Sequence, residues 1–318
     1  MRTRCGACAF VAHAGVVLLL PCLAPALARA QADSVAPRIV GLLQTRLAAM
    51  SAVGLTASVN RARVGVAGSA GSGLSYRVTV ELANTPTPYT VSLRDALIRW
   101  SRAGLRVTAG QFKTPFSRAF LEPLTILPTA DYAAVVTTLT PERDIGVMAD
   151  YDWHGRMEAA LGVFNGEGLN VGVNSDSSAM VVARVTARPL DAVRLGADIA
   201  RSRDSTRYGF EAGVVYGSFE IRGEFMGQHR LGRSADDMGW FLAGIMRLGP
   251  TVDLVLQQED LQRPMVATFV RNTATTLGID VFLDGGRERL LANYVSRRTG
   301  TRLGTLIVQA QISVGRAD

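Results

Sequence analysis

Cysteine, histidine and lysine are scarce in this chain of 318 residues, and their scarcity excludes several kinds of chemistry. All three cysteines lie within the first 30 residues, and the histidines beyond residue 30 are His154 and His229. Neither histidine has the spacing of a metal site or of an activated nucleophile. The one lysine is Lys113. We therefore expect no catalytic residue, no metal site and no cofactor, and we expect that the protein is not an enzyme.

Residues 1–30 have the layout of a Sec signal peptide that is removed from the mature chain. Two arginines precede the apolar run Phe10–Leu20, and residues 28–30 form a small-x-small cleavage site. The apolar run is too short to span a bilayer. A lipoprotein alternative would use Cys22, but Pro21 stands where a small residue is expected.

Removal of residues 1–30 changes the inventory of the mature chain. No cysteine remains, so disulfides and thiolate metal sites are not expected. Three of the 34 basic residues leave with the signal peptide, so 31 basic residues face 27 acidic ones, a balance of +4. This weak excess removes the main support for nucleic acid as a partner.

Long apolar runs are absent as well. No uninterrupted apolar stretch reaches about 18 residues, so no membrane-spanning helix is expected. Yet 48% of the chain is hydrophobic, and this material follows a period of two residues. In 143–153, Ile145, Val147 and Ala149 point one way while Asp144 and Asp150 point the other, a separation that a strand makes and a helix does not.

About sixteen segments show this alternation, and we expect each to be a strand. The segments are 37–47, 57–67, 74–83, 92–101, 104–112, 143–152, 157–165, 178–188, 192–201, 207–216, 218–228, 238–248, 251–260, 274–283, 288–297 and 303–314.

The connections between these segments alternate between short and long. The short ones are rich in Gly, Pro and Asp, as tight turns are. The longer, mostly polar ones fall at 113–142, 166–177, 202–206, 229–237, 261–273 and 298–302. Tight periplasmic turns and longer external loops are typical of an outer-membrane barrel. We therefore predict an all-β fold, a transmembrane antiparallel β-barrel of about 16 strands, formed by residues 31–318 as a single domain.

The width of such a barrel decides which face is apolar. Sixteen strands enclose an interior that side chains cannot fill. The consistent arrangement puts Ile, Val, Leu and aromatic side chains against lipid and charged side chains around water, and closure satisfies every backbone group in the membrane. The alternative of a soluble secreted β-protein, with the apolar face inside, remains open at this point.

The segment 113–142 differs from the other connections because it is long and apolar. It would be the third external loop, and exposing Phe116, Phe120 and Leu124 to water would be unfavourable. We expect this loop to fold toward the lumen and to narrow the pore. The alternatives are a plug that closes the lumen and an outer cap.

Three motifs in this part of the chain resemble a known family, the phosphate-selective porins O and P. They are Gly-Gln-Phe-Lys-Thr-Pro-Phe at 110–116, Arg-Asp-Ile-Gly at 143–146 and Gly-Val-Phe-Asn-Gly-Glu-Gly at 162–168, and the earlier 61–68 also matches. The resemblance implies a trimeric sixteen-stranded channel. It also implies an anion path of arginines on the inner wall and lysines near the constriction.

Only part of that path is carried over to this chain. Lys113, Arg61, Arg63 and Arg143 match motif positions, and no second lysine is available for a lysine cluster. Side chains predicted to line the pore from inward strand positions or from the long loop are Arg77, Arg99, Arg106, Asp150, Arg184, Glu220, Arg222 and Arg118. For each arginine, a salt bridge across the wall is the alternative to a solute site.

These features predict an outer-membrane porin for passive diffusion of small hydrophilic solutes, with a preference for anions such as phosphate. Selectivity would come from pore width and from the sign of the wall charge. The expected partners are these solutes, outer-membrane lipid and two further copies of the chain in a homotrimer. A structural barrel with a plugged lumen and an outer-membrane hydrolase are the alternative functions.

Overall fold

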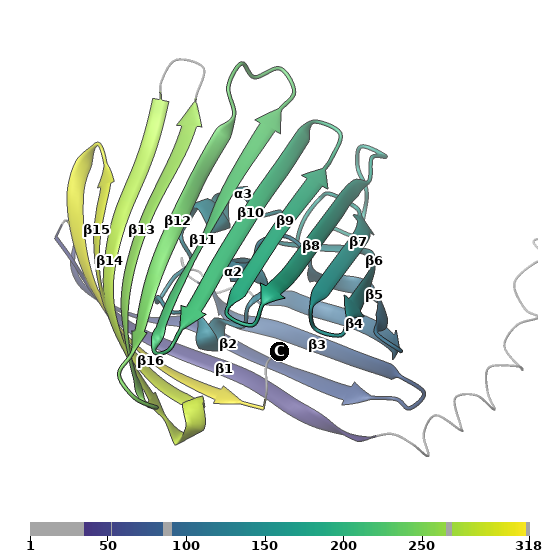
Figure 1. The fold of residues 1–318 in the computed structure, drawn as a ribbon, viewed down its shortest axis with the longest axis horizontal. Helices are drawn as coiled ribbons and strands as arrows, with labels where there is room; N and C mark the ends of the chain where they lie inside the picture. Colours follow the sequence, from purple (N-terminus) through teal and green to yellow (C-terminus); the bar gives the residue numbers. More distant parts are fainter. Residues whose placement is uncertain (1–34, 52, 85–90, 265–268, 316–318) are drawn as a thin grey trace, which may run out of the picture.

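The fold is a closed barrel of sixteen antiparallel strands, counted in the part of the chain that the computed structural model describes, residues 35–51, 53–84, 91–264 and 269–315. Each strand is hydrogen-bonded to its neighbours in sequence, and β1 pairs with β16 to close the ring (Figure 1). The predicted all-β barrel and its number of strands are thus confirmed. The predicted signal peptide, residues 1–30, lies outside the described residues.

The strands range from 8 to 16 residues in length. They are β1 (Val35–Met50), β2 (Gly54–Ser69), β3 (Leu74–Asn84), β4 (Ser92–Arg102), β5 (Leu105–Lys113), β6 (Arg143–Trp153), β7 (Met157–Phe164), β8 (Met180–Leu190), β9 (Val193–Arg201), β10 (Ser205–Tyr216), β11 (Phe219–Arg230), β12 (Asp237–Arg247), β13 (Val252–Pro264), β14 (Phe269–Leu283), β15 (Glu288–Thr299) and β16 (Thr301–Val314).

The two faces of the wall differ in polarity as the alternation predicts. Outward side chains such as Val147, Phe219 and Val308 are 53%, 55% and 44% exposed, whereas Asp150 and Glu220 are 4% and 7% exposed. Apolar groups therefore cover the outside of the cylinder and charged groups the inside. β1 and β16 pair over ten residues, 41–50 with 305–314, and this pairing closes the barrel at the seam.

Connection lengths are sorted between the two ends of the barrel. Seven short turns share one end: residues 70–73, 103–104, 154–156, 191–192, 217–218, 248–251 and 284–287. The opposite end carries the long connections 114–142 and 165–179. The predicted alternation is therefore confirmed for these segments.

Four predicted loops are shorter than expected. The connections predicted at 202–206, 229–237, 261–273 and 298–302 shrink because the flanking strands continue, and between β15 and β16 only Gly300 remains. These strand ends carry polar residues on the outward face, as at Arg271 and Thr273, so the apolar alternation stops before the hydrogen-bonded ladder does.

The helices in the described residues are short. They are α2 (Arg118–Leu121), η2 (Leu124–Ile126), α3 (Ala134–Leu139) and the turn η3 (Asp284–Gly286). Among these described elements, no helix has both the length and the apolar character needed to cross a membrane. All but η3 belong to the connection between β5 and β6.

The outward face can be tested by placing a charge on it. Leu242 lies midway along β12 and is 51% exposed. We expect Leu242→Arg to lower the free energy of unfolding in phospholipid vesicles by about 2–4 kcal/mol, measured by urea titration, because arginine at the bilayer midplane is costly. The control Thr305→Arg, on the inner face of β16, should change it by about 0.5 kcal/mol or less. Equal losses in both variants would contradict the assignment of the faces.

Candidate functional site

The connection 114–142, here called the internal loop, lies inside the barrel. Figure 1 shows α2 and α3 within the ring of strands. Hydrogen bonds join the loop to side chains of β1, β5, β9, β10, β11, β13, β15 and β16. The loop therefore occupies the lumen along most of the circumference, from β9 round to β1.

An apolar cluster holds one side of the internal loop against the wall. Phe116, Val135 and Leu139 are completely buried and belong to one cluster with the inward side chains Met226 and Phe241. Burying a side chain of this size stabilises by about 1.5–3 kcal/mol. This packing explains why so long a connection is rich in apolar residues.

Three carboxylates accept hydrogen bonds from the backbone at the start of α2. The backbone N–H groups of residues 117–119 donate at 3.2, 2.9 and 2.6 Å to Asp198, Glu211 and Glu224, respectively. These three residues, here called the carboxylate cluster, project from β9, β10 and β11. Arg184 bridges Asp198 and Glu211 at 2.8 and 2.6 Å. Each buried charge therefore has donors, which is the condition for keeping it buried.

The side chains of α2 form ion pairs on the same side of the lumen. Glu122 accepts from Arg118 and Arg222, each at 2.8 Å, and Arg118 also lies 3.3 Å from Glu220. Arg118, Arg222 and Glu220 were predicted to line the pore. The structure places all three in the network that holds the loop to the wall.

Two arginines hold the remainder of the internal loop. Arg289 donates to the carbonyl oxygens of Thr125 at 3.1 Å and Leu127 at 2.6 Å. Arg46 forms a two-pronged pair with Asp131, with both N–O distances at 2.9 Å. Neither arginine was singled out from the sequence, because their partners are backbone carbonyls and a loop acid that no strand pattern locates.

Lys113 also forms hydrogen bonds to the internal loop. Its Nζ donates to the carbonyl oxygens of Phe120 at 2.6 Å, Leu121 at 3.3 Å and Glu122 at 3.1 Å. An ammonium group has three donors, so these contacts engage all of them. The lysine that the family resemblance suggested for solute contact therefore stabilises the end of α2.

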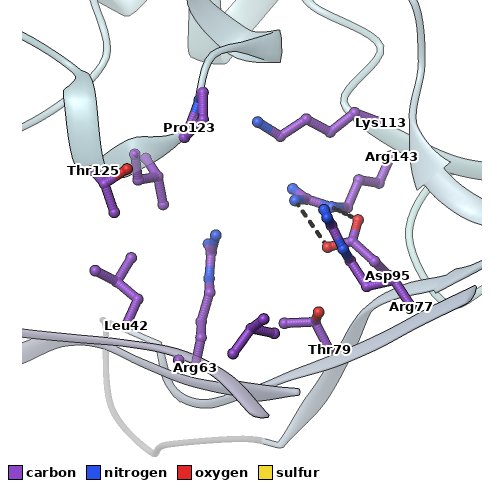
Figure 2. Close-up of a pocket in the computed structure, with 12 residues that line it drawn as sticks. Leu42, Arg63, Arg77, Thr79, Asp95, Lys113, Pro123, Thr125 and Arg143 are labelled. Atoms are coloured by element: carbon purple, nitrogen blue, oxygen red, sulfur yellow. Dashed lines mark hydrogen bonds and ion pairs between the residues drawn. The ribbon is translucent and has the colours of Figure 1, made fainter. Parts of the chain in front are cut away.

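Between the internal loop and strands β1–β6 lies a recess of about 60 Å³, here called the basic recess (Figure 2). Four cationic side chains line it, Arg63, Arg77, Lys113 and Arg143, against one carboxylate, Asp95. Arg143 donates to Asp95 at 2.9 Å. The recess therefore carries a formal excess of three positive charges.

A larger cavity of about 390 Å³, here called the basic cavity, shares part of this lining. Six cationic side chains and three acidic ones surround it: Arg77, Arg99, Arg106, Lys113, Arg143 and Arg184 against Asp95, Asp150 and Glu158. The formal excess is again three positive charges. Low-dielectric walls around such a cavity strengthen its potential and raise the local concentration of anions.

The remaining predicted residues have structural partners. Arg61 donates to Gln44 at 2.9 Å and lies outside the lining of both basic spaces. Arg63 pairs with Glu81, and Arg106 pairs with Asp150. The expected wall salt bridges are therefore present, and several residues that form them also line the basic spaces.

Tyr132 was missed by the sequence reasoning. It belongs to the internal loop, packs on Phe120 with ring centroids 5.9 Å apart, and lines a separate cavity of about 630 Å³ beyond the loop. Burial raises the pKa of its phenol, which keeps the side chain neutral. Its place could not be inferred from strand periodicity because the loop has none.

Comparison with known families and structures agrees with this architecture. Residues 50–192 match the model of the phosphate-selective porin O and P family, so the resemblance inferred from the motifs is confirmed over that range. No curated protein matches the chain by sequence.

Solved structures of similar fold include three from different bacteria. The trimer form of in-vitro folded OmpT, an outer membrane protein of Vibrio cholerae, is 13% identical with a TM-score of 0.67 over 88% of this chain and 99% of that one. The anion-selective porin from Comamonas acidovorans is 14% identical with a TM-score of 0.68, over 89% and 100%. The outer membrane channel DcaP of Acinetobacter baumannii is 13% identical with a TM-score of 0.64, over 89% and 98%. At such low identity these similarities concern the fold.

Docking of the internal loop on the carboxylate cluster is open to a direct test. Glu224 accepts from both the hydroxyl of Ser117 and the N–H of Ala119, each at 2.6 Å. In Glu224→Gln one acceptor oxygen is replaced by an N–H₂ group that faces a donor. Hydrogen bonds to charged groups contribute about 1.5–3 kcal/mol. We therefore expect amide hydrogen exchange at residues 117–119 to accelerate roughly ten- to a hundred-fold, on the same scale.

The matched control is Asp260→Asn, which alters an ion pair with Arg271 between β13 and β14. Exchange at residues 117–119 should be unchanged in that variant. Unaltered exchange in Glu224→Gln would show that the carboxylate cluster does not hold the loop.

Proposed function

We propose that this chain, which over residues 50–192 matches the phosphate-selective porin O and P family, is an outer-membrane channel for small anions. The observation that supports this most directly is the division of charge in the lumen. The acidic side chains of β9–β11 are bonded to the internal loop, and each basic space, along β1–β8, carries a formal excess of three positive charges, with Arg184, which bridges the carboxylate cluster, included for the larger one.

Solutes would move by passive diffusion along this basic wall. Charged side chains close to the path attract anions and repel cations, and the internal loop sets the width. No bound group is required for such transport. The anion-selective porin from Comamonas acidovorans, with the same fold, is in keeping with this proposal.

The same proposal covers location and assembly. Residues 1–30 would direct export as a Sec signal peptide and be removed, and residues 31–318 would form the barrel in the outer membrane, with lipid around its apolar face. The family match and the trimer form of the Vibrio cholerae OmpT support a homotrimer.

One observation favours a second candidate, a structural barrel whose lumen is closed. The internal loop is hydrogen-bonded to side chains of eight strands, β5 and seven others from β9 round to β1, which is more than a narrow constriction needs. Conductance measurements separate the two functions, because a closed barrel passes no current.

The selectivity of the channel depends on the basic wall. We expect the refolded protein to give discrete conductance steps in planar bilayers and an anion-selective reversal potential in a salt gradient. Arg77→Gln combined with Arg99→Gln should lower the anion-to-cation permeability ratio by up to about five-fold per charge, since one charge contributes about 1 kcal/mol at 4 Å in water.

The matched control removes two exposed arginines outside the basic spaces, with Arg287→Gln and Arg302→Gln. The permeability ratio should stay close to that of the wild type. A ratio that falls equally in both double variants, or a wild-type channel that prefers cations, would contradict the proposal.

The contribution of the internal loop is tested by its removal. We expect replacement of residues 117–138 by a short Gly-Ser linker to raise the single-channel conductance several-fold, because the loop occupies much of the lumen. Heat-modifiable gel migration confirms that the variant still forms a barrel. Conductance that appears only in the variant would establish the closed barrel instead.

A further inference from the structure

The side of the basic recess opposite the cations is apolar. Val40 and Leu42, on β1, are 3% and 5% exposed, and Leu124, on the internal loop, is 8% exposed. Pro123 and one polar residue, Thr125, complete this side (Figure 2). In Figure 2 the guanidinium group of Arg63 extends into the space between Leu42 and Arg143. The recess therefore has a cationic side and a hydrocarbon side.

Much of the hydrogen-bonding capacity on the cationic side is already engaged. Lys113 donates to three carbonyl oxygens, and Arg143 donates to Asp95 through Nε at 2.9 Å and through an Nη at 3.5 Å. The Nε of Arg63 donates to Glu81. These groups supply positive charge, but they supply few new donors to replace the water around a fully hydrated oxyanion.

We propose that the basic recess binds small organic monoanions, with the carboxylate toward Arg63 and Arg77 and a short hydrocarbon body against Leu42 and Leu124, in preference to inorganic phosphate. This inference rests on the proposed anion-channel function and names its class of solute. It does not follow from the family match, which points to phosphate.

The two classes of anion differ in the free energy of losing their hydration water in this recess. Phosphate presents polar oxygens in every direction, so those that face Val40 and Leu42 lose water without gaining a partner, which is unfavourable. A carboxylate has one polar end. Its methylene groups gain from leaving water, at about 0.8 kcal/mol each, or roughly four-fold in affinity.

The size of the recess limits the length of the body. On the measure that gives about 60 Å³ for this recess, about 10–15 Å³ holds one water molecule, so the recess has room for about four small groups. It therefore accepts the first two or three carbons of a chain, and longer chains extend into the basic cavity, where they face charged groups.

A homologous series of carboxylates measures this preference. The refolded full chain is placed in planar bilayers in potassium chloride, and formate, acetate, propionate, butyrate, hexanoate or phosphate is added at constant ionic strength and pH 7. The readout is the concentration that halves the chloride current. We expect this concentration to fall by about two- to four-fold per methylene from formate to propionate, and then to level off. Protein-free bilayers control for direct effects of the longer acids on the membrane.

Two double variants form a matched pair for the apolar side. Val40→Thr with Leu42→Thr makes the recess polar while keeping residues that suit strands. Val255→Thr with Leu291→Thr changes buried inward side chains of β13 and β15 that do not line the recess. The first variant should lose the dependence on chain length, and the second should keep it.

The wild-type series alone can overturn the inference. Half-blocking concentrations that do not depend on chain length, or a lower value for phosphate than for propionate, would refute it, as would equal effects of the two double variants. Failure of the proposed function is seen separately, before any carboxylate is added, as absent conductance or a preference for cations in potassium chloride.

Discussion

Docking of the internal loop on the carboxylate cluster is the interaction on which the lumen of this barrel depends. Three consecutive N–H groups, at residues 117–119, meet Asp198, Glu211 and Glu224 on three adjacent strands. Carboxylates in a narrow lumen are unfavourable without donors, and so are the N–H groups of a short helix without acceptors. Each set satisfies the other, and the loop is thereby fixed on the acidic side.

As a consequence, the charged side chains on the two sides of the lumen differ in their partners. On the side of β9–β11, charges are used to hold the chain to itself, with Arg118, Arg184 and Arg222 completing the network. On the side of β1–β8, the positive charges outnumber the negative ones and border open space, with Arg184 of β8 shared between the two sides. A barrel with acidic and basic residues mixed along its strands can therefore still border open space in which one sign of charge dominates.

The contacts of Lys113 differ from those that the family resemblance implies for a lysine at this motif position. The family resemblance assigns lysine at this position to the anion path, but here its ammonium group is taken up by the carbonyl oxygens of residues 120–122. With no second lysine in the chain, arginines and nearby aliphatic side chains border the recess. This combination is the basis of the proposed preference for a solute with one charged end over a symmetric, strongly hydrated ion.

The sixteen strands, the apolar outer face and the long third loop are all predictable from the sequence, because alternation with a period of two and tight-turn residues are local properties of the chain. The sequence also indicated which arginines and acids face inward, Arg77 and Asp150 among them. Only the tertiary structure decided which of these charges hold the loop and which border open space. The partners of residues 117–119 lie 81 to 107 positions further along the chain. Such pairings depend on how the closed barrel brings distant strands and an aperiodic loop together.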